Sequence, residues 1–194
     1  MDPTETAKAT GARLWQCPPE QVFSEDVSSF FPWAKHHAIV LVKNIAHETV
    51  LVVVPPDGEA TPVGAAQDLG VLNRVLKQEN VRLPEGMPPR QLALSVRFFL
   101  AGPGGFVADK EFFARNKRFV ELAARDDAEK LRLFEQSCRE PELQRREDLW
   151  RLDFRYFNNR GGVEQWNAEG DVETIRNAVS KGLAPDRTFS LPYG

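Results

Sequence analysis

The sequence has little cysteine, no long apolar run and no large excess of charge of either sign. Its two cysteines, Cys17 and Cys138, form no CxxC pair, which excludes a disulfide framework and favours a reducing compartment. The longest apolar runs, residues 38–42 and 50–54, are too short to cross a bilayer. Residues 1–14 are polar and lack the apolar core of a secretory signal. We therefore expect a soluble, cytoplasmic protein with no membrane partner.

The charge balance argues against a nucleic-acid partner. The formal net charge is −3 and the isoelectric point is about 5.7. The basic-looking stretch 110–155 holds twelve cations but also eleven acids, interspersed as on a solvated helix surface. We expect no phosphate-tracking patch.

Catalytic and metal-binding motifs are also missing. The sequence has no GxSxG, SxxK or HExxH pattern and no complete phosphate-binding loop. His36, His37 and His47 flank a predicted hairpin. Adjacent strand residues point to opposite faces, so His36 and His37 should not share an ion. We expect neither a metal nor a cofactor.

The length and composition predict a globular chain with one main domain. Its 194 residues are 42% hydrophobic and 27% charged, and globular domains usually hold about 100–200 residues. Residues 1–14 offer little to bury and are expected to be a flexible N-terminal tail. Residues 15–194 are expected to form a single domain.

The apolar patterns predict an α+β fold. Residues 38–42 and 49–54 are almost continuously apolar and predict a hairpin with both faces covered. A helix is expected over 69–81, an alternating strand over 92–100, and two helices between Asp109 and Cys138, with Asp109 as an N-cap. A hairpin from 149 and a helix over 171–182 would complete the order ββα–β–αα–ββα. The resulting single domain would have a mostly antiparallel sheet of about five strands, with helices mainly on one face.

The hairpin after residue 149 has a predictable register. Its first strand alternates, and residues 158–162 carry turn chemistry. A five-residue loop would place Phe154 opposite Trp166, whereas a loop shorter by one would place Gln165 there. We predict the aromatic pair, with its rings in contact on the buried face.

Two candidate anion sites emerge from this arrangement. If residues 92–100 and the hairpin share a sheet, then Arg97, Arg151, Asp153 and Arg155 lie on one face, and a guanidinium fork can bind a carboxylate or phosphate. The turn that contains Gly102, Gly104 and Gly105 would join a strand to a helix and could present backbone N–H groups to a phosphate. Both features also have plain structural interpretations, as a solvated sheet face and a chain turn.

The leading functional interpretation is a non-enzymatic cytosolic binding or adaptor domain. No acid, base, nucleophile or metal set converges in the pattern, and the partner would be an unknown protein or a small anionic ligand. The alternative is a small-molecule, transferase-like enzyme. In it the glycine turn would hold a phosphorylated cofactor, the arginines would orient an anionic substrate, and Asp153 would be the candidate base.

Overall fold

The computed structural model describes residues 2–63, 69–124, 127–158 and 160–189. The α+β class with mostly antiparallel strands is confirmed, but the strands form two sheets, of four and five strands, instead of one. The chain divides into two compact units, which are described separately. Unit 1 comprises residues 1–103 and 172–174, and unit 2 comprises 104–171 and 175–194. A single domain over residues 15–194 stays a prediction. Within the described ranges, no helix is long and apolar enough to cross a membrane.

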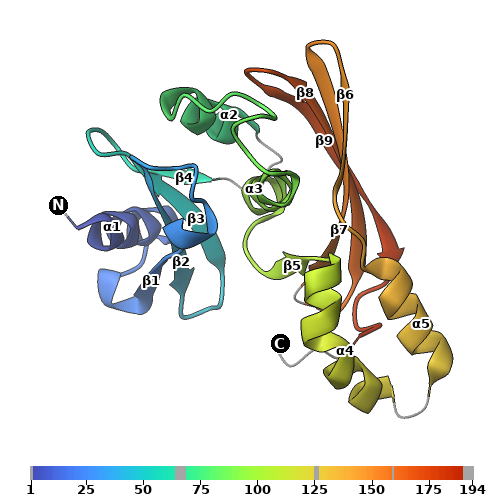
Figure 1. The fold of residues 1–194 in the computed structure, drawn as a ribbon. Coiled ribbons are helices and arrows are strands. Elements are labelled where there is room, and N and C mark those ends of the chain that lie inside the picture. The colour runs from blue at the N-terminus through green and yellow to red at the C-terminus, as the bar shows by residue number, and fades with distance from the viewer. Residues whose placement is uncertain (1, 64–68, 125–126, 159, 190–194) are drawn as a thin grey trace. The chain divides into compact units, whose positions relative to one another are not determined.

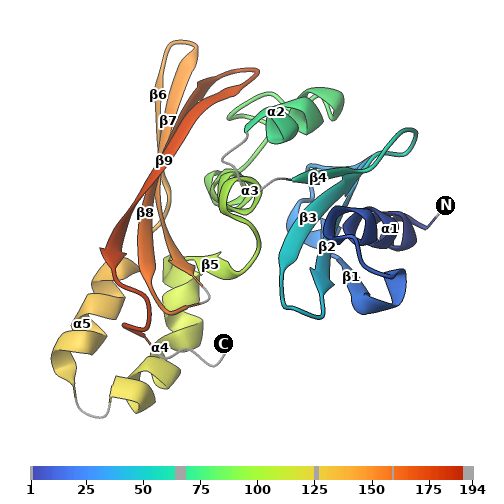
Figure 2. The same ribbon diagram turned by 180° about the vertical axis from the view of Figure 1, so that it is seen from behind.

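Unit 1 contains a four-stranded antiparallel sheet in the order β1-β2-β3-β4, with helices on both faces (Figures 1 and 2). Two short 3₁₀ turns flank β1. The helices and strands of unit 1 are α1 (Pro3–Trp15), β1 (Val22–Asp26), β2 (Ala38–Asn44), β3 (Thr49–Val54), β4 (Thr61–Val63), α2 (Leu69–Gln78) and α3 (Pro89–Ala101).

The predicted central hairpin is confirmed as β2 and β3. These strands pair in antiparallel register, with Val40 opposite Val52. Val40 and Val52 pack in a cluster with the small residues of α1, while Ile39 and Val53, which alternate with them, are also buried. Covering both faces explains why the two runs are apolar almost throughout.

Helix α1 corrects the expectation that residues 1–14 form a flexible tail. Asp2 caps the helix by accepting a hydrogen bond from the Thr4 main-chain N–H at 2.9 Å. Ala7 is completely buried, and a Cβ atom added to Gly11 would lie only 2.7 Å from the Val42 side chain. The helix therefore packs through small residues, which sequence patterns of large apolar residues do not reveal.

Helix α3 corrects the strand expected over residues 92–100. Pro89 stands in the first turn, where its missing N–H is not needed. Leu92, Val96 and Phe99 follow at helical spacing and are buried. Their neighbours are buried too, so the helix is apolar on several sides and its sequence also alternates as a strand would.

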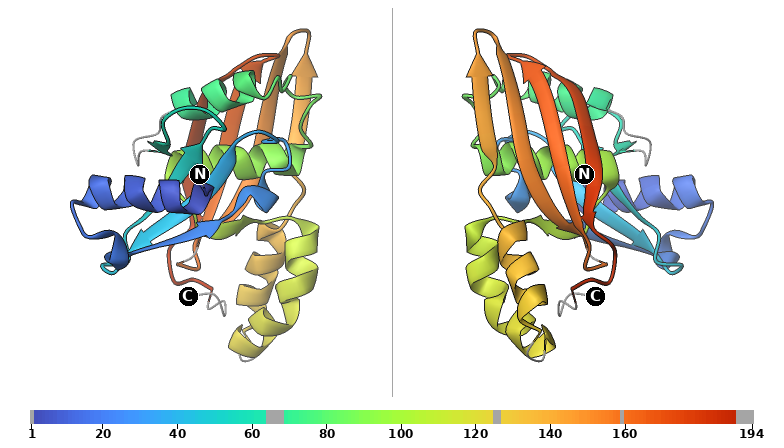
Figure 3. Two further views of the ribbon diagram at one scale, coloured as in Figure 1. Left: turned by 90° about the vertical axis from the view of Figure 1, so that its left-hand side faces the viewer. Right: turned by 90° about the vertical axis from the view of Figure 1, so that its right-hand side faces the viewer.

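Unit 2 contains the five-stranded antiparallel sheet in the order β5-β7-β8-β9, with β6 paired to β7 as well. Its elements are β5 (Gly105–Val107), α4 (Lys110–Ala124), α5 (Ala128–Ser137), β6 (Glu142–Arg146), β7 (Leu149–Asn158), β8 (Val163–Asp171) and β9 (Ile175–Ala184). The right-hand view in Figure 3 shows β6 to β9 side by side.

The predicted register of the β7–β8 hairpin is confirmed. Phe154 lies opposite Trp166, and Phe157 lies opposite Val163, as the five-residue loop requires. The rings of Phe154 and Trp166 are stacked, with centroids 6.1 Å apart and an interplanar angle of 13°. Both side chains are buried.

Strand β9 corrects the helix expected over residues 171–182. It pairs with β8 in antiparallel register, from Val163 opposite Ala184 to Gly170 opposite Ile175, with a shift near each end. Ile175 and Val179, interpreted from sequence as a helix stripe, suit a strand as β-branched residues. The main-chain groups of β8 need partners on its second side, and β9 supplies them.

Helices α4 and α5 cover one end of the sheet in unit 2 (Figure 1). The ring centroids of Phe112 and Phe134 lie 5.0 and 5.1 Å from that of Phe157 on β7. Asp109 caps α4 as predicted, because its carboxylate accepts a hydrogen bond from the Phe112 N–H at 2.7 Å. Beyond this aromatic cluster, the same sheet face carries polar side chains.

Candidate functional site

The polar face of the β6–β9 sheet is the candidate site. Along β7, Leu152, Phe154 and Tyr156 are buried, whereas Arg151, Asp153 and Arg155 alternate with them and are at least partly exposed. The three predicted β7 site residues therefore share one face, called here the polar face. Their partners on β8 are Glu169, Asn167 and Gln165, in that order.

Arg155 ties the polar face to the end of helix α5. Its Nη1 donates a hydrogen bond to the main-chain carbonyl of Gln136, in the last turn of the helix. Burial and the nearby Arg139 guanidinium lower the pKa of Arg155, while the Asp153 carboxylate opposes them. A cation at the carboxyl end of a helix is favourable, so this side chain stabilises the fold.

Asp153 is engaged by two neighbours. Its Oδ1 accepts a hydrogen bond from Nη2 of Arg139 at 2.8 Å, and its Oδ2 accepts one from Nε2 of Gln165 at 2.8 Å. Each oxygen of this carboxylate already accepts a hydrogen bond, one of them from a charged guanidinium, which favours the ionised form. This arrangement suits a structural role better than the role of a general base.

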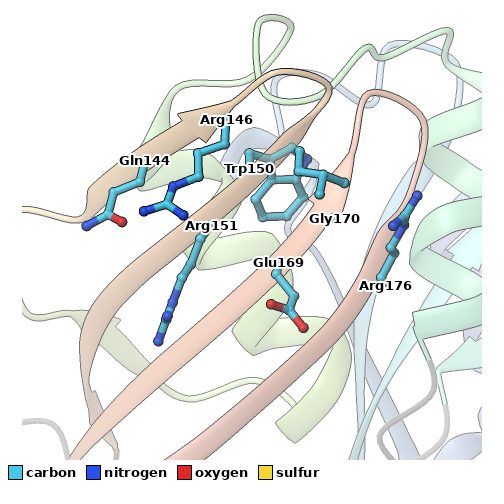
Figure 4. A pocket seen from close by; sticks show the side chains of 8 residues that line it. Gln144, Arg146, Trp150, Arg151, Glu169, Gly170 and Arg176 are labelled. Carbon is cyan, nitrogen blue, oxygen red and sulfur yellow. The ribbon is translucent and has the colours of Figure 1, made fainter.

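A cavity of about 430 Å³ lies at the end of the sheet where β6 leads into β7 and β8 leads into β9 (Figure 4). Its charged lining comes from four strands, because Arg146 is on β6, Arg151 on β7, Glu169 on β8 and Arg176 on β9. The lining holds three arginines and one glutamate, so it is net positive. Arg176 is also paired with the Asp171 carboxylate, whose Oδ2 lies 2.9 Å from its Nη2, which leaves Arg146 and Arg151 as the main positive charges. The other lining residues are Gln144, Leu149, Trp150 and Gly170.

Arg151 lies between this cavity and a second one of about 250 Å³. The smaller cavity is lined by Arg139, Glu142, Gln144, Arg151 and Asp153. Gln144 and Arg151 therefore belong to both cavities. Nη2 of Arg151 donates to Oδ1 of Asn167 on β8 at 3.1 Å, which orients the guanidinium across the face.

Arg97 does not belong to this polar face, contrary to expectation. It lies on α3 in unit 1 and is buried, and its Nη1 donates to the main-chain carbonyl of Gly102 at 2.9 Å. The residue that was expected to line a sheet instead holds the end of its own helix. The reason is the helical conformation of residues 89–101.

The glycine turn also differs from the expected phosphate site. Gly102 and Gly104 lie between helix α3 and strand β5, so the turn does not join a strand to a helix. Gly105 has φ +116°, and a Cβ atom there would lie 2.0 Å from the Phe157 carbonyl oxygen. Close approach of β5 to β7 explains this glycine without a ligand.

A polar cluster in unit 1 was missed by sequence reasoning. The Glu79 side chain is buried and accepts hydrogen bonds from three consecutive main-chain N–H groups, those of Lys35, His36 and His37, at 2.8 to 3.0 Å. Nδ1 of His36 and Nδ1 of His37 also lie 2.9 and 2.6 Å from its oxygens. Burial alone would raise the pKa of this carboxyl, but the hydrogen bonds from His37 and His36 lower it to about 2.

The histidine cluster shows why the argument from strand parity was incomplete. His36 and His37 precede β2, so their side chains are not forced to opposite faces, and both reach Glu79. Among the described residues, no group of three or more histidine, cysteine, aspartate or glutamate side chains is arranged to hold a metal. The expectation of a metal-free protein stays a prediction.

Sequence reasoning also missed Arg139, Arg146 and Arg176. Arg146 was hidden because the charged strand β6 has no apolar alternation, and Arg176 because β9 was interpreted as a helix. The alternation of apolar and polar residues along β7 was the sequence signal that located Arg151, Asp153 and Arg155 on one face.

No protein-family model, curated protein or solved structure matches this chain.

Proposed function

We propose that the protein is a non-enzymatic binding domain that recognises carboxylate groups of a partner protein at the polar face of unit 2. The observation that carries the proposal is the cavity of about 430 Å³, whose lining includes Arg146, Arg151 and Arg176 but a single acidic side chain; of the three arginines, Arg176 is also paired with Asp171. Guanidinium groups bind carboxylates through paired hydrogen bonds. A net positive lining favours an anionic ligand over a neutral one.

The position of Arg151 supports a surface that accommodates more than one acidic group. This residue borders both cavities, and a chain with carboxylates several ångströms apart could place one in each. The exposed strands around it supply a polar rim, which is typical of protein interfaces. The engagement of Asp153 by Arg139 and Gln165 favours this binding role over the transferase-like alternative.

The direct test measures binding of a fluorescein-labelled tetraglutamate peptide to the full chain by fluorescence anisotropy, with tetraglutamine as the neutral control. We expect saturable binding of tetraglutamate only, weakened by salt because the contacts are exposed. Arg151→Ala should lower the affinity about tenfold, the equivalent of about 1.4 kcal/mol.

The matched control variant is Arg160→Ala. Arg160 is an exposed arginine of the same unit, 3.5 Å from Asp186, outside both cavities. The Arg160→Ala variant loses the same charge as Arg151→Ala, so its affinity for tetraglutamate should stay within about twofold of that of the wild type. Equal losses in the two variants, or equal binding of tetraglutamine, would contradict the proposal.

A thermal-shift screen separates the proposed function from the enzyme alternative. A ligand at 100 times its Kd stabilises a protein by about 2.7 kcal/mol. We expect no shift with phosphorylated metabolites, which the transferase-like alternative requires as cofactors. A phosphorylated metabolite that stabilises the wild type but not Arg151→Ala would replace the proposal with the small-molecule enzyme.

A further inference from the structure

Strand β9 is the longest strand at an edge of either sheet in the described part of the chain. It has ten residues, against five in β1 and β6 and three in β4 and β5. On one side it pairs with β8, and the described residues contribute no strand to its other side. A long edge strand presents a row of main-chain donors and acceptors to any added strand.

Strand β9 lacks two of the usual protections against strand addition, a short length and a proline. Edge strands are commonly shortened, bent by bulges, interrupted by proline or protected by charged side chains, lysine above all. The protection that β9 has in its regular part is the charge of Lys181, which opposes a basic strand but not an acidic one. The edge strand β4 contains Pro62, whereas residues 175–184 contain no proline. The register shifts lie near the ends of the β8–β9 pairing, so residues 177–182 form a regular stretch.

The side chains of β9 define the chemistry of a complementary strand. Val179 and Lys181 lie opposite Asn167 and Gln165, so both are on the polar face. Leu183 follows at the register shift, between Gly182 opposite Glu164 and Ala184 opposite Val163. Val179 is 54% exposed and Leu183 is 40% exposed. Residues 175–184 include two cations, Arg176 and Lys181, and no acid.

We infer that β9 is a docking strand for an extended segment of a partner protein, with an acidic side chain beside Lys181 and apolar side chains beside Val179 and Leu183. Main-chain hydrogen bonds supply the affinity in strand addition, and alternate side chains supply the specificity. Charge decides against a second copy of this chain, because that would bring another strand with cations and no acids. This inference concerns the sheet edge and does not rest on the proposed function of the polar face.

The test uses a blocked heptapeptide, Thr-Val-Thr-Glu-Thr-Val-Thr, whose palindromic sequence fits β9 in either strand direction. A counterpart with lysine at the central position is the control. Binding to the full chain is followed by backbone amide chemical shifts and hydrogen exchange. We expect slower exchange within residues 177–182 and saturable shifts in β9 with the glutamate peptide only.

Charge reversal makes the test specific. Lys181→Glu should lower the affinity for the glutamate peptide about fivefold and make the lysine peptide the better ligand, since cross-strand charge pairs contribute up to about 1 kcal/mol. Lys181 is exposed, so the variant should fold. Lys77→Glu, at an exposed position on α2 in unit 1, carries the same charge change and should bind as the wild type does.

Three outcomes would overturn the inference. The first is that the amide chemical shifts and hydrogen exchange of β9 do not change at millimolar glutamate peptide. The second is equal binding of the two peptides. The third is a concentration-dependent dimer in which residues 177–182 are protected from hydrogen exchange without any peptide. Arg151→Ala should leave the peptide's effect on β9 intact. Lys181→Glu therefore tests peptide binding at β9, and Arg151→Ala tests carboxylate binding at the polar face, so either proposal can fail without the other.

Discussion

The buried Glu79 carboxylate should make a large, pH-dependent contribution to stability. Five donors surround it: the main-chain N–H groups of residues 35–37 and the two imidazole Nδ1 atoms. Burial would raise the pKa of this carboxyl, but the hydrogen bonds from His37 and His36 outweigh it and lower the pKa from 4.5 to about 2. At about 1.4 kcal/mol per pKa unit, the ionised form gains about 3 kcal/mol on folding. This stabilisation is fully present above pH 4.5. It is lost as the pH falls towards 2, because the Glu79 carboxylate then becomes protonated in the folded state as well.

The measurement is urea unfolding of Glu79→Gln and the wild type from pH 7 down to pH 2. The variant should lose about 3 kcal/mol of unfolding free energy near neutral pH, since a neutral amide replaces the carboxylate that accepts these hydrogen bonds. Its deficit should shrink as the pH falls below 4.5. Glu20→Gln, at an exposed position of the same unit, is the control and should follow the wild type. A deficit in Glu79→Gln that stays constant from pH 7 to pH 2 would refute the reasoning.

Three further perturbations test the packing of unit 2. Phe154→Ala should cost about 3–5 kcal/mol in urea unfolding, because it deletes a fully buried ring stacked on Trp166. Cys138 should react with a thiol reagent far more slowly than Cys17 in the folded protein, because burial and the Asp109 carboxylate raise the pKa of its thiol to about 12. Gly105→Ala should lower the melting temperature, since its Cβ would clash with a main-chain oxygen; an unchanged value would show that β5 can move away from β7.

The sequence predicted those elements whose side-chain pattern has one physical meaning. The β7–β8 register followed from two aromatic residues and a turn, and the structure places Phe154 against Trp166 as expected. The Arg151, Asp153 and Arg155 face followed from strict alternation along one strand. In both cases local geometry, with a period of two, was enough to place the side chains.

The errors arose where one pattern suits two structures. Residues 92–100 alternate, yet the burial of most of α3 makes a helix equally compatible with that pattern. Ile175 and Val179 have helical spacing, yet residues 175–184 form a strand because they pair with the second side of β8. Tertiary context decides such cases. Helix α1 escaped notice because Ala7 and Gly11 pack by being small.

Side-chain NMR of the arginines in the full chain would test the central claim most directly. With arginine labelled at Nε, tetraglutamate should produce saturable shifts at Arg146, Arg151 and Arg176, which line the cavity of about 430 Å³. Arg13, an exposed residue of unit 1, should not respond. If Arg151 stays unshifted, or shifts no more than Arg13, then the polar face does not bind carboxylates.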